Sequence, residues 1–186
     1  MSVESSVVEV LKNSTVGSIN FKIDVVSVNR EQMAAVAAAI EKQDIAVEVA
    51  GTGPQLGAAY SSFVSRRWGA GEKKLIGKIT LGNANVAKSA MGKASIFHES
   101  VHALMDVKGL KVSMHNDEVV AYLADALYLL MTSTRITSGQ AEMAIYNAAF
   151  NIIAAHKMQT KVGVMLKWTD CDALRDAIKA HPDYRG

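Results

Sequence analysis

One short segment combines residue types that can bind a metal ion and act on a water bound to it. Residues 98–102 read His-Glu-Ser-Val-His, so two histidines stand four positions apart with a glutamate directly after the first. On a helix, residues four apart lie on one face one turn apart, so both imidazoles can reach one ion. Glu99 is turned about 100° from His98 and can reach a water on that ion. The spacing predicts that His98 and His102 are metal ligands and that Glu99 is a general base.

A third ligand is needed, because a catalytic zinc ion usually takes three protein ligands and leaves its fourth position to water. Asp106 is excluded, since on a straight helix it lies about 12 Å along the axis from His98. Glu118 follows in a second helix, after a break at 109–113 that lets the chain turn back. We therefore expect Glu118 as the third ligand. Asp117 and His115 are alternatives, and Glu118 can also be a plain helix N-terminal acid that complements the helix dipole.

These residues resemble the glutamate-type zincins, the thermolysin-like metallopeptidases. The resemblance spans positions 98 to 125 and rests on His98-Glu99-x-x-His102-Ala103-x-x-Asp106, followed by Asn116-Asp117-Glu118. It implies a zinc ion on His98, His102 and Glu118, Glu99 as the general base, and Asp106 as the residue that orients the second histidine. The family's acidic residue four positions after the ligand glutamate is Tyr122 here, and Asp125 is its expected substitute.

The resemblance implies a zinc metallopeptidase that hydrolyses a protein or peptide substrate. Its short spacing between the two helices is similar to the minimal zincin domains of bacterial toxins and effectors. A donor must stabilise the charge that develops on the carbonyl oxygen, and the candidates are Tyr60, His115, Tyr122 and His156. The strand expected at 74–81 is similar, by position, to the zincin edge strand that pairs with an extended substrate.

The elements that position these residues are predicted from hydrophobic periodicity. Strands are expected at 21–28, 45–49 and 74–81, and a helix begins after Asn29. Helices are expected at 89–108, 115–133, 138–158 and 170–180, with Gly109 ending the first and Thr137 and Thr169 capping the last two. The predicted fold is α+β: a small N-terminal β-sheet with one helix, then a mostly helical half carrying the HExxH motif. Residues 1–186 are expected to form a single zincin-like domain.

Composition narrows the class of protein further. The chain of 186 residues is 49% hydrophobic and 20% charged, which is typical of a globular protein. Its lone cysteine, Cys171, can form neither an internal disulfide nor a thiolate-rich zinc site, and we expect it to be inert. The start of the chain lacks the features of a secretory signal peptide, and Val119 to Met131 is too short to span a bilayer. We expect a cytoplasmic protein, or one exported without a classical signal peptide, and no membrane partner.

Two other functions compete with peptide hydrolysis. In the first, the metal ion is structural and holds two helices together, and the protein surface binds a partner without catalysis. In the second, the basic segment at 66–78 binds nucleic acid. The net charge of +2 makes this partner less favoured, and such a segment is more often a solvated loop. Its cations are Arg66, Arg67, Lys73, Lys74 and Lys78. The oligomeric state is open.

Overall fold

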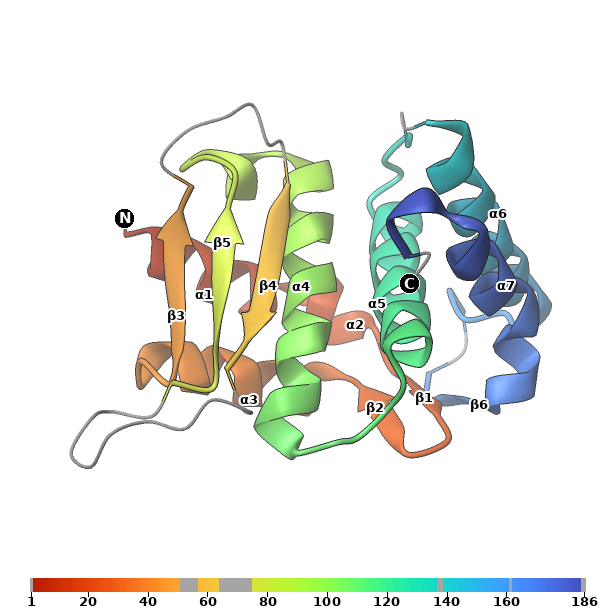
Figure 1. Ribbon diagram of the computed structural model, residues 1–186, viewed down its shortest axis with the longest axis horizontal. Coiled ribbons are helices and arrows are strands. Elements are labelled where there is room, and N and C mark those ends of the chain that lie inside the picture. Colours follow the sequence, from red (N-terminus) through yellow and green to blue (C-terminus); the bar gives the residue numbers. More distant parts are fainter. Residues whose placement is uncertain (1, 51–56, 64–74, 137–138, 161, 185–186) are drawn as a thin grey trace.

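A computed structural model describes residues 2–50, 57–63, 75–136, 139–160 and 162–184. The fold is mixed α+β, as predicted, with two small three-stranded sheets and a larger helical part. Figure 1 shows the sheet β3-β5-β4 at one end, the helices α4 and α5 side by side in the middle, and α6 and α7 at the other end. No helix in the described ranges is long and apolar enough to cross a membrane.

Two helices that the sequence analysis missed open the chain. α1 (Val3–Lys12) and α2 (Ser14–Ser18) are capped by the side chains of Ser2 and Asn13, which accept from backbone N–H groups of the first turn. α1 packs its buried face against α3 (Arg30–Glu41), the helix predicted after Asn29. The expectation of a single helix in the first half is therefore wrong. The signal was present in the buried Val7, Val10 and Leu11 of α1, which recur at helical steps.

The segment 21–28 forms a hairpin, so the expectation of one strand there is also wrong. β1 (Phe21–Ile23) and β2 (Val26–Val28) pair antiparallel, and Asp24 between them has a φ of 47°. Aspartate tolerates this left-handed conformation better than most residues, which allows the chain to reverse at this point. β6 (Val164–Leu166) pairs in parallel with β1, so the second half is not purely helical as expected.

The larger sheet has the order β3-β5-β4. β3 (Ile45–Val49) is parallel to β5 (Gly77–Leu81), and β4 (Ala58–Ser62) is antiparallel to it. The predicted edge role of the strand at 74–81 is wrong, because β5 pairs on both sides and lies in the centre. The edge strand that faces α4 is β4. Its sequence, Ala-Ala-Tyr-Ser-Ser, has no β-branched run, so its signal for a strand is weak.

α4 (Ala90–Lys108) carries the HExxH motif and begins and ends as predicted. Ser89 caps its first turn by accepting from the backbone N–H of Gly92. A Cβ on Gly92 would lie 1.9 Å from the carbonyl oxygen of Val86, in the short helix η1 (Val86–Lys88), so this close approach requires glycine. Gly109 ends the helix with a φ of 62°, a conformation that glycine adopts without strain.

α5 (Met114–Met131) packs directly against α4. Ser113 caps it, and nearly every residue after Glu118 is buried. α6 (Gln140–Ala155) and α7 (Asp172–Ala180) cover its other side. Thr169 is not the cap of α7, because it lies inside the short helix η2 (Trp168–Cys171), while Thr137 falls outside the described residues. The chain closes with η3 (Pro182–Tyr184).

Two other expectations involve residues away from the motif. The basic positions 66, 67, 73 and 74 lie outside the described residues, and Lys78 forms an ion pair with Glu48 at 2.7 Å. Cys171 is buried and free, and burial raises the pKa of its thiol to about 12. A thiol with that pKa holds its proton at neutral pH, in agreement with the expected inertness.

Candidate metal centre

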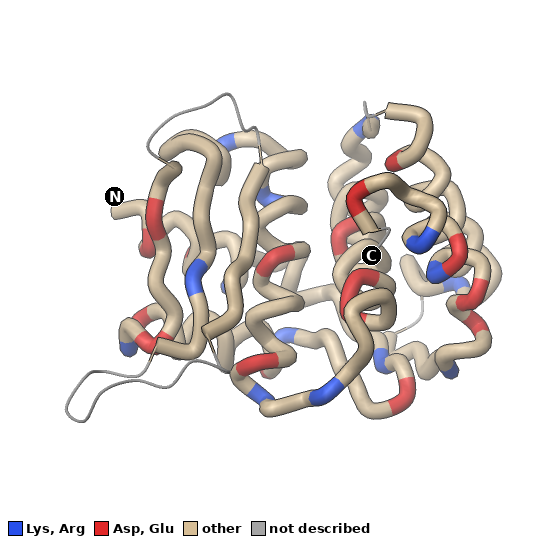
Figure 2. Tube along the Cα trace, in the orientation of Figure 1, with Lys and Arg blue, Asp and Glu red and all other residues tan. Residues whose placement is uncertain are grey.

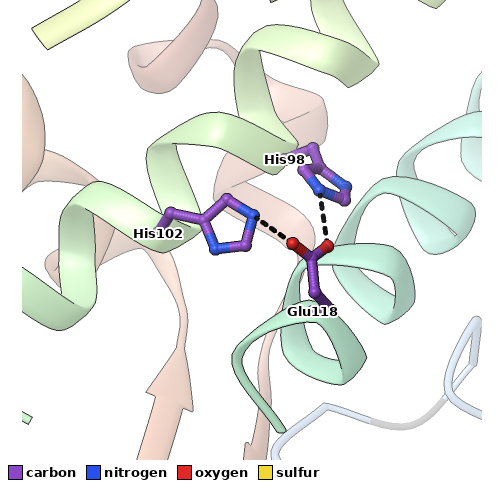
Figure 3. A group of neighbouring side chains, drawn as sticks. All are labelled: His98, His102 and Glu118. Carbon is purple, nitrogen blue, oxygen red and sulfur yellow. Dashed lines mark ion pairs between the residues drawn. The ribbon is translucent and has the colours of Figure 1, made fainter. Parts of the chain in front are cut away.

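Three side chains from α4 and α5 converge on one point. His98 and His102 project from one face of α4, and Glu118 approaches from the first turns of α5 (Figure 3). The Nε2 atom of His98 lies 3.4 Å from Oε2 of Glu118, and Nε2 of His102 lies 3.7 Å from Oε1. One ligand atom from each residue lies within 4.8 Å of the other two. The predicted group His98, His102 and Glu118 is thus close enough to bind one metal ion.

The outer nitrogen of each imidazole has a carboxylate partner on α5. Nδ1 of His98 lies 3.2 Å from Oδ2 of Asp125, and Nδ1 of His102 lies 3.0 Å from Oδ1 of Asp117. The Asp125 contact is a hydrogen bond, whereas the Asp117 contact is a close approach of Oδ1 that does not meet hydrogen-bond geometry. A carboxylate at the outer nitrogen orients a ring and leaves Nε2 free to bind a metal. Asp125, the residue expected in place of Tyr122, thus contacts the first histidine of the motif.

The described contacts of Asp106 differ from those that the resemblance implies. Asp106 accepts a hydrogen bond from the Tyr60 hydroxyl at 2.8 Å, which ties α4 to β4. The His102 ring turns instead toward α5, where Asp117 meets it. Asp117 was considered only as an alternative ligand, and its position one residue before Glu118 gave no separate signal for its contact with the ring.

Glu99 lies on the side of α4 that faces the edge strand. Its Oε2 accepts from the backbone N–H of Tyr60 at 2.7 Å, and one turn earlier Ser95 accepts from the N–H of Ala58 at 2.8 Å. These two strand residues direct their N–H groups away from β5 and toward α4. The carboxylate of Glu99 is therefore fixed at the rim of a hollow that also contains both histidines.

The electrostatics of the group favour a positive charge at its centre. Burial lowers the pKa of His98, but the neighbouring carboxylates of Asp125 and Glu118 raise it by more, so its pKa lies well above the ordinary value. Burial raises the pKa of Glu118, but the two imidazoles outweigh this effect and its pKa is lowered. Burial raises the pKa of Glu99, and the imidazoles reverse only part of that rise.

Tyr184 is a site residue that the sequence analysis did not identify. It comes from η3, and its hydroxyl lies 3.1 Å from that of Tyr122 and within hydrogen-bonding reach of Glu118. Tyr122 itself packs edge-on against the His98 ring, with centroids 4.8 Å apart. A tyrosine so far along the chain carries no local pattern that links it to the motif.

The other predicted donors lie in different places. Tyr60 lines the hollow, but its hydroxyl is bonded to Asp106. His156 ends α6 at the opposite end from the metal group and lines a separate hollow beside α7. His115 lies in the first turn of α5 but does not line the hollow over the metal group. The hollow over the group has a volume of about 340 Å³, and its walls include Ala59, Ser62, Met114 and Tyr184.

The contacts of the two outer nitrogens predict unequal effects of three similar substitutions. Asp117→Asn and Asp125→Asn should each weaken zinc binding about 10- to 100-fold, because each imidazole loses the carboxylate that orients it. Asp106→Asn should leave zinc affinity near that of the unchanged protein. Competition with a chromophoric chelator measures all three, and a loss in Asp106→Asn equal to that in Asp117→Asn would contradict the assignment.

The raised pKa of His98 predicts that, in the metal-free protein, its imidazole keeps a second proton as the pH rises above about 6.5, the ordinary value for histidine. Its contribution to folding stability is then full below about pH 6.5 and is lost as the pH rises through the folded pKa. Nitrogen chemical shifts of the ring report the charge directly. Zinc should convert the ring to its neutral form, and a ring already neutral near pH 6.5 without metal would refute the prediction.

Comparison with known proteins does not assign the chain to a family. No family model matches the chain, and neither a curated protein nor a solved structure matches it. What the geometry shows is a group of two histidines and a glutamate, on two packed helices, that is close enough to bind a metal ion.

Proposed function

We propose that the protein is a zinc-dependent peptide hydrolase of the zincin type. The observation that carries the proposal is the convergence of His98, His102 and Glu118, with Glu99 fixed beside them. Two imidazoles and a carboxylate are a ligand set typical of catalytic zinc. Because the group supplies three protein ligands and opens into a hollow, a fourth position is left for water, which favours catalysis over a purely structural metal.

The distances within the group are close to those around a tetrahedral ion. Bonds of about 2.0–2.2 Å in tetrahedral geometry place neighbouring ligand atoms about 3.3–3.6 Å apart. Nε2 of His98 lies 3.4 Å from one Glu118 oxygen, Nε2 of His102 lies 3.7 Å from the other, and one ligand atom from each residue lies within 4.8 Å of the other two, so small side-chain shifts would bring the three to that spacing. Oε2 of Glu118 is buried and makes no hydrogen bond among the described residues, a cost that a cation offsets, either the protonated His98 ring or a metal ion.

The reaction divides its tasks among the residues around the group. A zinc ion held there supplies Lewis acidity to water and to the carbonyl of the scissile bond. Glu99 accepts the proton of the attacking water and returns it to the leaving amine, and its raised pKa suits both transfers. The Tyr184 hydroxyl, beside Glu118, donates to the oxygen on which negative charge develops.

β4 forms one wall of the proposed substrate site. This strand lies at the edge of its sheet and along α4, next to Glu99 and the metal group. The outward N–H groups of Ala58 and Tyr60 already donate to Ser95 and Glu99, so at these positions β4 bounds the site and is not free to pair with a peptide main chain. The hollow over the metal group is bounded on one side by Ala59, Tyr60 and Ser62 of this strand.

Substitution of the proposed base tests the reaction. Glu99→Gln should lower the hydrolysis of a fluorogenic peptide library by at least about 10²–10⁴-fold, because the amide cannot accept the proton of water. The amide oxygen can still accept from Tyr60, so the fold and zinc affinity should persist. Glu31→Gln, the same change at an exposed site on α3, is the control. Full activity in Glu99→Gln would remove Glu99 from this role.

The proposed donor has a separate test. Tyr184→Phe should lower kcat/KM by about 10²–10³-fold while zinc affinity stays unchanged, because only the hydroxyl that meets the developing charge is lost. Tyr128→Phe makes the same change at a buried tyrosine of α5 that lines neither hollow beside the metal group, and it should keep its activity. Equal activities of the two variants would count against Tyr184 as the donor.

A further inference from the structure

A second hollow of about 440 Å³ adjoins the metal group on the His98 side. It shares His98, Glu99 and Tyr184 with the hollow over the group, so the two meet at the residues assigned to catalysis. A side chain of a peptide bound across Glu99 can therefore enter it. Its side at β4 is formed by Gly57, Ala58 and Ser95. Its other walls come from α4, α5 and α6: Met91, Ala94, Tyr122, Asp125, Glu142 and Tyr146.

About half of the wall is apolar or aromatic. Met91 and Ala94 line the side formed by α4. Tyr122 and Tyr146 line the side formed by α5 and α6, with ring centroids 5.7 Å apart and planes at 83°. An alkyl chain can pack along such a wall, and the faces of tyrosine rings attract a cation.

The charged part of the wall is acidic and incompletely partnered. Glu142 lies in the first turn of α6, where the helix dipole favours a negative charge, and it forms no ion pair within the described residues. Asp125 is 3% exposed, and its Oδ1 has no hydrogen-bond partner even though Oδ2 accepts from Tyr146 at 3.0 Å. By contrast, Glu99 and Asp106 each accept a hydrogen bond from Tyr60.

No lysine or arginine among the described residues lines either hollow. Figure 2 shows acidic positions on both of the neighbouring helices α4 and α5. A bound metal ion balances the carboxylates around the histidines, but Glu142 lies outside that group. The second hollow thus offers Glu142 as a carboxylate without an ion-pair partner in the described part of the chain, next to an apolar wall. A side chain with a positive charge at the end of an apolar stem complements both.

We propose that this hollow, which we call the Glu142 pocket, binds the arginine or lysine side chain of a peptide substrate, with Glu142 as the residue that determines specificity. The proposal rests on the proposed peptide hydrolysis and names its substrate class. The stem packs between Met91 and the tyrosine rings, and the cationic head meets Glu142. An apolar side chain of equal length leaves Glu142 without a partner, and an acidic one is repelled.

Peptide binding tests the pocket without requiring cleavage. The probes are blocked Ala-Ala-Xaa-Ala-Ala-Ala peptides in which Xaa is arginine, lysine, norleucine or glutamate, titrated calorimetrically into the full chain with zinc and without it. Arginine and lysine peptides should bind at least about tenfold more tightly than the norleucine peptide, and the preference should shrink as salt is raised. Equal affinity for norleucine and arginine would overturn the proposal.

Variants then assign the preference to one carboxylate. Glu142→Gln should remove it, Glu142→Asp should keep part of it, and Glu31→Gln should leave it unchanged. A preference that survives Glu142→Gln would also overturn the proposal. If no peptide is ever cleaved but the preference depends on Glu142, the hydrolase assignment fails while the pocket stands, so the two failures are distinguishable.

Discussion

The packing of α4 against α5 is the contact on which the site depends. The HExxH motif on α4 provides two imidazoles and Glu99, but the Glu118 carboxylate that completes the group and both outer partners of the imidazoles belong to α5. The two helices meet through a continuous apolar core that includes Phe97, Val101 and Leu123, each with no exposed surface. Close packing leaves little room for one helix to slide, so the separation of ligand atoms is set by side chains that never touch the metal.

This packing also explains how so many ionisable groups are tolerated in one place. A buried carboxylate is costly unless a hydrogen bond or opposite charge compensates for lost water. Asp125 lies in the middle of the apolar part of α5, where its Oδ2 atom meets both the His98 ring and the Tyr146 hydroxyl. In the absence of metal, the His98 imidazole, whose pKa is raised, supplies the positive charge itself. A proton and a metal ion thus compete for the same imidazole, which couples metal affinity to pH.

The sequence predicted what local spacing controls and missed what only the fold brings together. The spacing of His98 and His102 fixes their common face, and the break at 109–113 fixes the return of the chain toward Glu118. The contact of Asp117 with His102 depends instead on the rotation of α5 about its axis, which periodicity does not resolve to one residue. β4 was missed for a related reason: Ala58–Ser62 is a strand because β5 and α4 satisfy its backbone, not because its residues prefer one.

The same distinction decides where specificity can arise. Metal ligation and proton transfer require residues at fixed spacings on two neighbouring helices. Such spacings can be recognised in the sequence as a motif. In the proposed pocket, α4 and α5 supply part of the wall, and the rest comes from α6 and η3, which reach the group because the last third of the chain folds back over α5. Glu142 and Tyr184 thus border the metal group without resembling any part of a motif. Under the proposed function, a change at Glu142, which contacts none of the three metal-group residues in the described structure, can alter which peptide fits while the α4 and α5 contacts stay in place.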